Sequence, residues 1–322
     1  MKVLVTRVLP QEFLDQMQAV AELSVWTEQD PISSEELARR AADLTGLVCT
    51  LTDLVDEAFL AAAPRLKVIS QVAVGLDNID LPACTVRGLP VGHTPGVLTE
   101  TTADTAVALL LAVIRRLPEG EQYIKSGGWT AWDPDFLLGG DLHHTTVGIV
   151  GLGRIGAAVA RRVKGFEVEI LYSARNRKPD LEEELGAQFR ELDILLAESD
   201  HVVLTVPLST ATYHLLDERR LRLMKPDSTL VNIARGGVVD NLALARALTE
   251  GWVGRAALDV TEPEPIPTDH PLLKLDNCLI VPHIGSASYT SRDGMSQVAV
   301  ENLVAGLRGE RVPRCANPEV YG

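Results

Sequence analysis

A glycine-rich turn between a strand-like and a helix-like segment is the clearest chemical signal in the sequence. The run Val147–Val150 leads into GLGRIG at residues 151–156, and an alanine-rich helical run follows. In this context Gly151 allows a tight turn, Gly153 lets the main chain approach a pyrophosphate, and Gly156 lets the helix pack on the strand. The helix N-terminus then faces the phosphates. The motif predicts a dinucleotide site, because an ordinary turn would need three glycines to coincide at these spacings.

The residues after the next strand-like run indicate which dinucleotide. An NAD site places Asp or Glu about 20 residues beyond the glycine turn, where it binds the ribose 2′-hydroxyl. Here residues 172–178 read YSARNRK, with no carboxylate. Arg175, Arg177 and Lys178 could bind a 2′-phosphate through charge-assisted hydrogen bonds, with Ser173 as a further donor. We therefore predict a preference for NADP(H), with NAD(H) possible; the alternative is a solvated basic loop.

Three polar residues follow three later strand-like runs. Chemistry with a nicotinamide cofactor needs a cation to orient the substrate and a titratable group to exchange a proton. Arg235, Glu264 and His283 each come shortly after such a run, and prolines on both sides of Glu264 stiffen its turn. Ligands of doubly wound sheets bind beyond the carboxyl ends of the strands. One strand-end histidine would more often be structural, but the coincidence of three such residues favours a reactive site.

Six segments, in order, resemble the D-isomer-specific 2-hydroxyacid dehydrogenase family, and within it the glyoxylate/hydroxypyruvate reductases. They are VAVGLDNIDL (72–81), HTPGVLTETTAD (93–104), GIVGLGRIG (148–156), NIARGGVVD (232–240), ALDVTEPEPIPTDHPLL (257–273) and VPHIGSA (281–287). The set extends over essentially the whole chain and is highly specific. The resemblance implies NADPH-dependent reduction of glyoxylate to glycolate and of hydroxypyruvate to D-glycerate.

The resemblance also implies roles for the three strand-end residues. Arg235 matches the family's substrate-binding arginine, His283 its acid/base, and Glu264 the carboxylate paired with that histidine. In the implied reaction Arg235 binds and polarises the 2-oxo acid, hydride comes from NADPH, and protonated His283 gives its proton to the forming alkoxide. An ionised Glu264 would stabilise the charged imidazole.

Further contacts are implied by the same resemblance. Val74 and Gly75 match a loop whose main-chain N–H groups meet the substrate carboxylate, and Asp259 matches the residue that orients the nicotinamide amide. Ser286 is expected at the substrate. Additional cofactor contacts are expected at Arg154, Ile155, Pro207, Ile233 and Gly285.

Strand-like and helix-like runs alternate along the chain, which predicts parallel sheets and an α/β fold. A nearly apolar helix expected at 99–116 separates two series of strands, so we predict two doubly wound, Rossmann-like domains. The resemblance implies a discontinuous substrate (catalytic) domain, 1–98 plus 287–322, a dinucleotide-binding domain, 99–286, and an active site in the cleft between them. The expected strands are Val3–Thr6, Gly46–Thr50, Lys67–Gln71, Thr146–Val150, Glu167–Tyr172, His201–Thr205, Thr229–Ile233, Ala256–Leu258 and Leu279–Val281.

Composition limits the possible partners. The 322 residues are 46% hydrophobic and carry a net charge of −14, which disfavours nucleic acid and anionic membranes. No apolar run approaches the about 20 residues of a membrane span, and the first residues do not resemble a signal peptide, so we expect a cytoplasmic protein. Four scattered cysteines are expected to be reduced thiols. We predict no metal site, because His143 and His144 lack a third ligand.

Family dimers pack through the cofactor domains, so the resemblance implies a homodimer with helix 99–116 and loop 126–142 in or near the interface. Trp129 and Trp132 in this loop are typical packing anchors. The sharper hypothesis is that Trp132 reaches toward the partner's substrate pocket.

Two other functions remain open at this stage. A short phosphoglycerate or phosphite dehydrogenase would share the fold, although the former should prefer NAD and need extra cations for its phosphate. A cofactor-sensing protein related to transcriptional corepressors would also share the fold. The filled Arg, Glu and His positions and the absence of an extended tail after the last helix argue against it.

Overall fold

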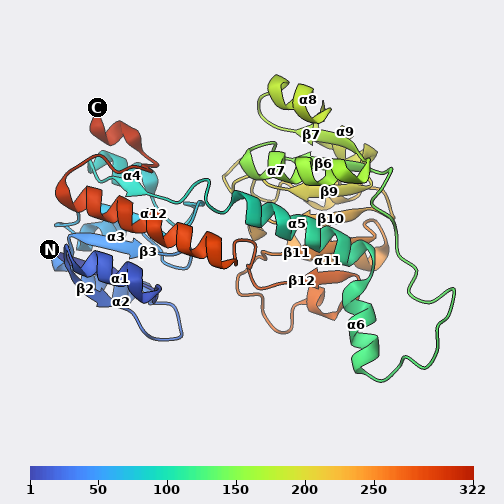
Figure 1. Ribbon diagram of the computed structural model, residues 1–322, viewed down its shortest axis with the longest axis horizontal. Coiled ribbons are helices and arrows are strands. Elements are labelled where there is room, and N and C mark those ends of the chain that lie inside the picture. Colours follow the sequence, from blue (N-terminus) through green and yellow to red (C-terminus); the bar gives the residue numbers. More distant parts are fainter. The chain divides into compact units, whose positions relative to one another are not determined.

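The computed structural model describes residues 1–322 and divides the chain into two compact units. Unit 1 comprises Met1–Leu98 and Ser288–Gly322, and unit 2 comprises Thr99–Ala287. Each unit contains a parallel sheet with helices packed against it (Figure 1). The expected α/β class with two doubly wound sheets is confirmed.

Unit 1 is built on a five-stranded sheet in the order β2-β1-β3-β4-β5. This order reverses direction beside β1, as doubly wound sheets do. The strands β3 and β4 are buried along their whole length, as expected for a parallel sheet covered on both faces, and the polar Ser70 and Gln71 of β4 form side-chain hydrogen bonds. The strands are β1 (Lys2–Val5), β2 (Glu22–Val25), β3 (Gly46–Cys49), β4 (Val68–Gln71) and β5 (Val91–Gly92).

The last long helix of the chain, α12 (Tyr289–Arg308), packs on the sheet of unit 1 (Figure 1). The helix approaches β4 closely, since a methyl group added at Gly306 would lie 2.5 Å from Val68. The Ser70 hydroxyl donates a hydrogen bond of 2.8 Å to the Ala299 carbonyl and fixes the register of helix on strand. The other α-helices of unit 1 are α1 (Gln11–Gln18), α2 (Ser34–Arg40), α3 (Glu57–Ala62) and α4 (Leu81–Val86).

Unit 2 is built on a seven-stranded sheet in the order β12-β11-β10-β9-β6-β7-β8. The chain starts in the middle, at β6, runs outward to β8, and then crosses to β9 on the other side. A ligand crevice is expected where the order reverses, at the carboxyl ends of β6 and β9. The strands are β6 (Thr146–Val150), β7 (Glu169–Ser173), β8 (Gln188–Phe189), β9 (His201–Leu204), β10 (Thr229–Asn232), β11 (Arg255–Leu258) and β12 (Cys278–Ile280).

The expected apolar helix forms α5 (Thr99–Ile114), which lies against α7 (Arg154–Val163) and the strands beneath it. Its buried side chains belong to one core cluster of unit 2. Arg162 on α7 binds Asp104 on α5 at 2.6 Å and so ties the two helices together. The remaining α-helices of unit 2 are α6 (Leu117–Lys125), α8 (Pro179–Leu185), α9 (Leu192–Glu198), α10 (Glu218–Leu221) and α11 (Asn241–Glu250).

The sequence analysis missed three strands, and it did not foresee the helix α6 that follows the expected helix at 99–116. β5 and β8 have two residues each, too few for a recognisable pattern, and β2 is a partly exposed edge strand. The helix expected to continue to residue 116 ends at Ile114. Arg116 adopts a left-handed conformation with φ 53°, and α6 starts directly after it with Pro118 in its first turn.

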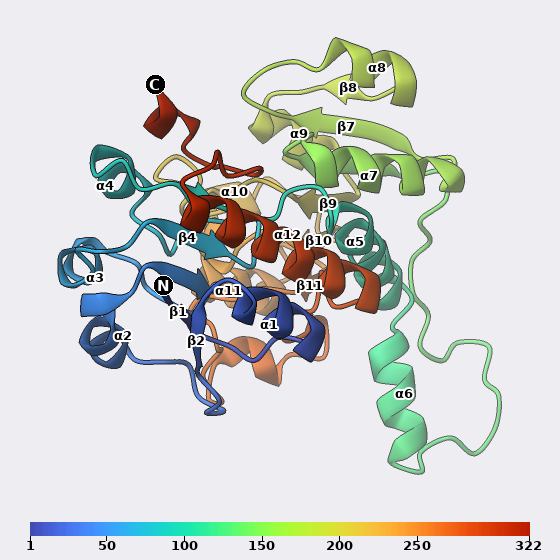
Figure 2. The ribbon, with the colours of Figure 1, turned by 60° about the vertical axis from the view of Figure 1, so that its left-hand side comes forward.

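Helix α6 and residues 126–142 form a segment, here called the arm, that lies outside the layered part of unit 2 (Figures 1 and 2). Most of its large apolar side chains are solvent-exposed, including Ile124, Trp129, Trp132 and Leu138, whereas Leu142 at its end is buried in the core of unit 2. Nowhere in the structure is a helix both long enough and apolar enough to span a membrane.

Candidate active site

Arg235, Glu264 and His283 come from three neighbouring strands of unit 2. The parallel strands β10, β11 and β12 lie side by side, so their carboxyl ends meet at one edge of the sheet. Arg235 follows β10, Glu264 lies in the loop after β11, and His283 follows β12. The sequence therefore concentrates a cation, a carboxylate and an imidazole at the edge where doubly wound sheets bind ligands.

His283 and Glu264 form a direct pair, with Nδ1 of the imidazole 2.5 Å from Oε1 of the carboxylate. Burial tends to raise the pKa of Glu264, but the hydrogen bond and charge of His283, with smaller help from the Thr261 N–H and Arg235, lower it below its ordinary value. Glu264 is therefore ionised at neutral pH and acts only as an acceptor. Nδ1 donates to it, and Nε2 remains as the ring nitrogen that can serve a substrate.

The turn that carries His283 is fixed by Asp259, which is 2% exposed. Asp259 Oδ1 accepts from the Ile284 N–H at 2.7 Å, and Oδ2 accepts from the Gly285 N–H at 3.0 Å. His283 itself has a φ of 51°, which is uncommon for a residue with a side chain and is found where the surroundings hold it. Burial raises the pKa of Asp259, although the two N–H donors oppose that shift. Sequence reasoning missed this supporting role.

Arg235 is braced by the end of its own strand. The buried Asn232 side chain donates to the Arg235 carbonyl at 2.9 Å and accepts from the Ala234 N–H at 3.0 Å. The next residue, Gly236, allows the loop after β10 to approach the loop after β11 closely. A methyl group at Gly236 would lie 1.8 Å from the Thr261 carbonyl oxygen. This contact explains why the position after Arg235 is a glycine. The sequence reasoning missed Asn232, although a polar residue at the end of an apolar strand could have pointed to it.

The glycine turn has the geometry that a pyrophosphate requires. Gly151 has a φ of 101°, and a methyl group on it would lie 2.7 Å from Val206, while one on Gly156 would lie 2.2 Å from the Gly151 carbonyl oxygen. By contrast, no atom lies within 4 Å of a methyl group at Gly153. No side chain caps α7, so the N–H groups at its start are left for another acceptor. The turn thus fits the diphosphate of a dinucleotide.

The three basic residues after β7 differ in their surroundings. Arg177 donates to Glu182 on α8, with Nη2 2.7 Å from Oε2. Arg175 is exposed and has no carboxylate partner. Lys178 forms hydrogen bonds through its main chain, where its N–H donates to the Tyr172 hydroxyl and its carbonyl accepts from the Glu182 N–H. Ser173 lies beside the glycine turn, since its carbonyl accepts from the Gly151 N–H at 2.8 Å. The structure therefore separates one engaged arginine from two cationic side chains that face solvent.

The other expected site residues lie on several loops. Val74 and Gly75 are in unit 1, after β4; there the Gln71 side chain donates to the Gly75 carbonyl at 3.3 Å, and His93 Nδ1 lies 3.1 Å from the Val74 carbonyl. The remaining residues are in unit 2. Arg154 and Ile155 open α7, Pro207 follows β9, Ile233 follows β10, and Gly285 and Ser286 follow His283.

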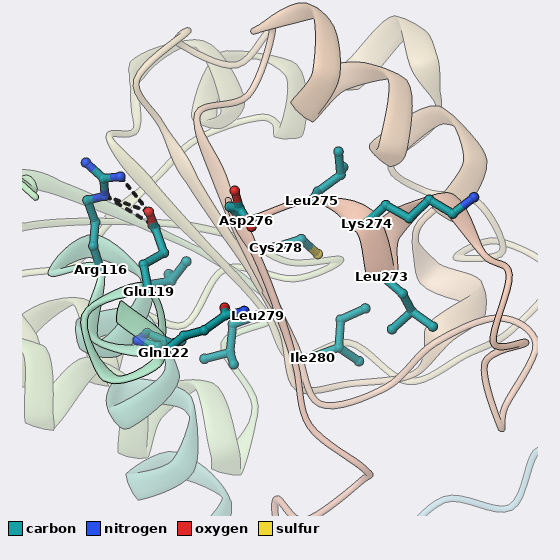
Figure 3. A pocket seen from close by; sticks show the side chains of 12 residues that line it. Arg116, Glu119, Gln122, Leu273, Lys274, Leu275, Asp276, Cys278, Leu279 and Ile280 are labelled. Atoms are coloured by element: carbon teal, nitrogen blue, oxygen red, sulfur yellow. Dashed lines mark hydrogen bonds and ion pairs between the residues drawn. The ribbon is translucent and has the colours of Figure 1, made fainter. Parts of the chain in front are cut away.

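A separate cavity of about 350 Å³ lies elsewhere in unit 2 (Figure 3). It is lined by residues of α5, α6, the segment before β12, and β12 itself, and the ion pair between Arg116 and Glu119 lies at one side. None of the strand-end residues lines it. The cavity also lies along an edge strand and the approach to its amino end, away from the carboxyl ends where ligands of such sheets bind.

Comparison with known proteins agrees with this geometry. Residues 107–285 match the family described as D-isomer specific 2-hydroxyacid dehydrogenase, NAD binding domain. A glyoxylate reductase of Thermococcus onnurineus is 49% identical over 323 aligned positions, which cover 99% of this chain and 96% of that protein. The chain belongs to the D-isomer specific 2-hydroxyacid dehydrogenase family. The matched range of this dehydrogenase includes the glycine turn, Arg235, Glu264 and His283.

Solved structures support the same assignment for the dehydrogenase. A protein of Thermus thermophilus is 47% identical and superimposes with a TM-score of 0.92, covering 98% of this chain and 100% of that chain. An NADPH-dependent glyoxylate/hydroxypyruvate reductase of Sinorhizobium meliloti, solved with NADP and malonate, is 31% identical with a TM-score of 0.85. That alignment covers 99% of this chain and 97% of the Sinorhizobium chain.

Replacing Asp259 with Asn tests the support of the His283 turn. An amide has one acceptor oxygen, so its NH₂ group would face one of the two N–H donors, at a cost of about 1–3 kcal/mol. We expect D259N to unfold at a lower temperature in calorimetry and to lose activity more than its stability loss explains. The matched control is Asp227→Asn, at an exposed carboxylate without a hydrogen-bond partner. An unchanged melting temperature and rate for D259N would contradict this role.

Proposed function

We propose that this dehydrogenase reduces glyoxylate to glycolate and hydroxypyruvate to D-glycerate, with NADPH as the preferred cofactor. The observation that carries the proposal is the paired His283 and Glu264 on the same sheet edge as Arg235, in a unit that also carries the glycine turn. The glyoxylate reductase at 49% identity and the NADPH-dependent glyoxylate/hydroxypyruvate reductase at 31% identity support the substrate class.

In the proposed reaction the chain binds a 2-oxo acid and delivers one proton. The Arg235 guanidinium binds the acid and polarises its carbonyl, which stabilises the negative charge that develops on oxygen. His283, protonated and held through Nδ1 by Glu264, gives its Nε2 proton to that oxygen. A bound nicotinamide cofactor supplies the hydride. The N–H groups of Val74 and Gly75 bind the substrate carboxylate, and Ser286 contributes a further polar contact.

The two units have different tasks in this proposal. Unit 1 is the substrate domain and unit 2 the dinucleotide-binding domain. The glycine turn binds the pyrophosphate, and Asp259, besides holding the His283 turn, orients the nicotinamide amide with a lone pair that the main-chain donors leave unused. The other proposed cofactor contacts are Arg154, Ile155, Pro207, Ile233 and Gly285.

The NADPH preference is assigned to the loop after β7. This loop offers no carboxylate for a ribose 2′-hydroxyl, and the exposed side chains of Arg175 and Lys178 have no carboxylate partner. Ser173 adds a donor beside the glycine turn. Arg177 must leave Glu182 before it can bind a phosphate with its full set of donors, so we propose Arg175 as the main phosphate ligand.

Initial rates with glyoxylate and hydroxypyruvate, each with NADPH and NADH at equal concentration, test this function. We expect faster turnover with NADPH for both acids. Arg175→Ala should raise the KM for NADPH about tenfold, the equivalent of one charge-assisted hydrogen bond, and leave the KM for NADH unchanged.

Arg177→Ala is the matched comparison, because it removes the same charge from the same loop. We expect a smaller increase in the KM for NADPH than in R175A. Faster turnover with NADH in the wild-type protein would refute the cofactor proposal. Absence of turnover with either acid, despite cofactor binding, would refute the substrate proposal and favour another 2-hydroxyacid or a sensing role.

Glu264→Gln tests the acid/base pair through the pH profile. The ionised Glu264 accepts a hydrogen bond from His283 and stabilises its imidazolium form, whereas the neutral amide of the variant lacks the negative charge and favours that form less. Reduction requires imidazolium, so the basic limb of kcat/KM for glyoxylate should move to lower pH. Oxidation of glycolate requires neutral imidazole, so its acidic limb should move in the same direction. Profiles that coincide with those of the wild type would rule out this role.

We also propose that the protein is a homodimer that uses the arm and α5 of unit 2. The arm carries Trp129, Trp132 and Leu138 with exposed fractions of 60%, 80% and 63%, an apolar surface that a monomer would leave in water. In this arrangement Trp132 reaches toward the partner's substrate pocket.

Trp132→Ala separates the two parts of this proposal. We expect sedimentation velocity to show a weaker dimer, and the ratio of kcat/KM for hydroxypyruvate to that for glyoxylate to change by several-fold. Leu242→Ala, on α11, is the control, because Leu242 is also apolar and exposed but lies outside the arm. A monomeric wild-type protein would overturn the dimer, and an unchanged ratio in W132A would overturn the contact with the partner's pocket.

A further inference from the structure

A second histidine–carboxylate pair lies in unit 2 beside the proposed catalytic residues. His214, in the loop after β9, places Nε2 2.6 Å from Oε2 of Glu262, in the loop after β11. Their side chains are 32% and 35% exposed, so the pair is partly shielded from water. Neither residue was assigned a role from the sequence. The pair joins two loops that extend from strands separated in the sheet by β10.

His214 is connected to the loop between them as well. Its main-chain N–H donates to the Gly237 carbonyl at 2.7 Å, immediately beyond Arg235 and Gly236. Its φ of 45° is a left-handed conformation that needs support in a residue with a side chain. The Tyr213 ring stacks on the imidazole with centroids 4.1 Å apart and planes at 14°. One residue therefore links the loops after β9, β10 and β11.

Glu262 also contacts the start of α11 and the loop after β10. Asn241 donates to the Glu262 carbonyl at 3.2 Å, and Oε1 of Glu262 lies 3.2 Å from where a methyl group on Gly237 would be. The preceding residue, Thr261, is the one that Gly236 approaches most closely. Because Glu264 is only two positions further along, a shift of Glu262 would move the carboxylate that pairs with His283.

We infer that the hydrogen bond between His214 and Glu262 positions Arg235 and Glu264 for the reaction. The two residues touch neither substrate nor cofactor and act through the loops they join. A displacement of about 1 Å in a reacting group can cost about 100-fold in rate, so a bond that fixes two such loops matters for catalysis more than for binding. This inference rests on the proposed function for the roles of Arg235, Glu264 and His283.

Variants of the pair, made in the full-length protein, test the inference. Glu262→Ala removes the acceptor, and His214→Ala removes its donor; each should lower kcat for glyoxylate by tenfold or more and change the KM for NADPH less than threefold. Glu262→Gln keeps an oxygen acceptor and should restore kcat to within about threefold of the wild type. The double variant H214A/E262A should be no worse than the poorer single variant, because both remove one interaction.

The control is Glu198→Gln, which removes a carboxylate paired with Arg190 in the same unit, outside these loops, and should keep the wild-type kcat. If E262A does not fold, H214A carries the test. Wild-type kcat in E262A or in H214A, or an E262Q as impaired as E262A, would overturn the inference.

A second readout separates this inference from the proposed function. The ring signals of His283 in NMR spectra, assigned with a His283→Gln variant, should shift in E262A and return toward wild-type positions in E262Q. If the wild-type protein reduces neither acid, the proposed function fails while the NMR comparison still tests the pair. Unchanged His283 signals in E262A would overturn the positioning role whatever the substrate.

Discussion

The parallel arrangement of β10, β11 and β12 is the constraint on which the candidate site depends. Parallel neighbours in register end at the same edge of a sheet, so their loops must share a small volume. The chain meets this demand with Gly236, where any side chain would collide with the Thr261 carbonyl. Only this close approach lets the loop with Arg235 and the loop with Glu264 lie beside each other. The reactive groups are thus brought together by strand order first and by side-chain contacts second.

Charged side chains at such an edge need hydrogen-bond partners, and the structure gives its two carboxylates different kinds of partner. Asp259 is buried and bound by two main-chain N–H groups, so it serves as a fixed support for the His283 turn. Glu264 is more exposed and is bound by the His283 imidazole; burial opposes ionisation, but this hydrogen bond and the charge of the ring keep the pKa of the carboxyl below its ordinary value. Two carboxylates from one loop therefore have different tasks because their surroundings differ. Positioning of this kind, completed before substrate arrives, is the usual basis of electrostatic stabilisation in enzymes.

Sequence reasoning found the parts of the fold that rest on local pattern. The glycine turn and the three strand-end residues were recognisable because motif and strand order together specify where they lie. The two-residue strands β5 and β8 carry no such pattern, and α6 was hidden because the break at Arg116 depends on one left-handed residue. The link between His214 and Glu262 joins residues 48 positions apart and exists only because β9 and β11 flank β10. Long-range pairs of this kind follow from the sheet, and composition or spacing does not reveal them.

The basic loop after β7 shows the same limit of sequence-based prediction. Here the limit concerns which residue of the loop could distinguish one cofactor from another. From the sequence, Arg175 and Arg177 were equivalent candidates for a 2′-phosphate. In the structure Glu182 lies close to this loop, and a bare carboxylate there would repel a phosphate. Arg177 and the Tyr172 hydroxyl both donate to Glu182, which lowers the pKa of its carboxyl and offsets its charge. In the proposed NADPH site, Arg177 thus favours the 2′-phosphate indirectly, by neutralising Glu182, while Arg175 is the guanidinium proposed to bind it directly.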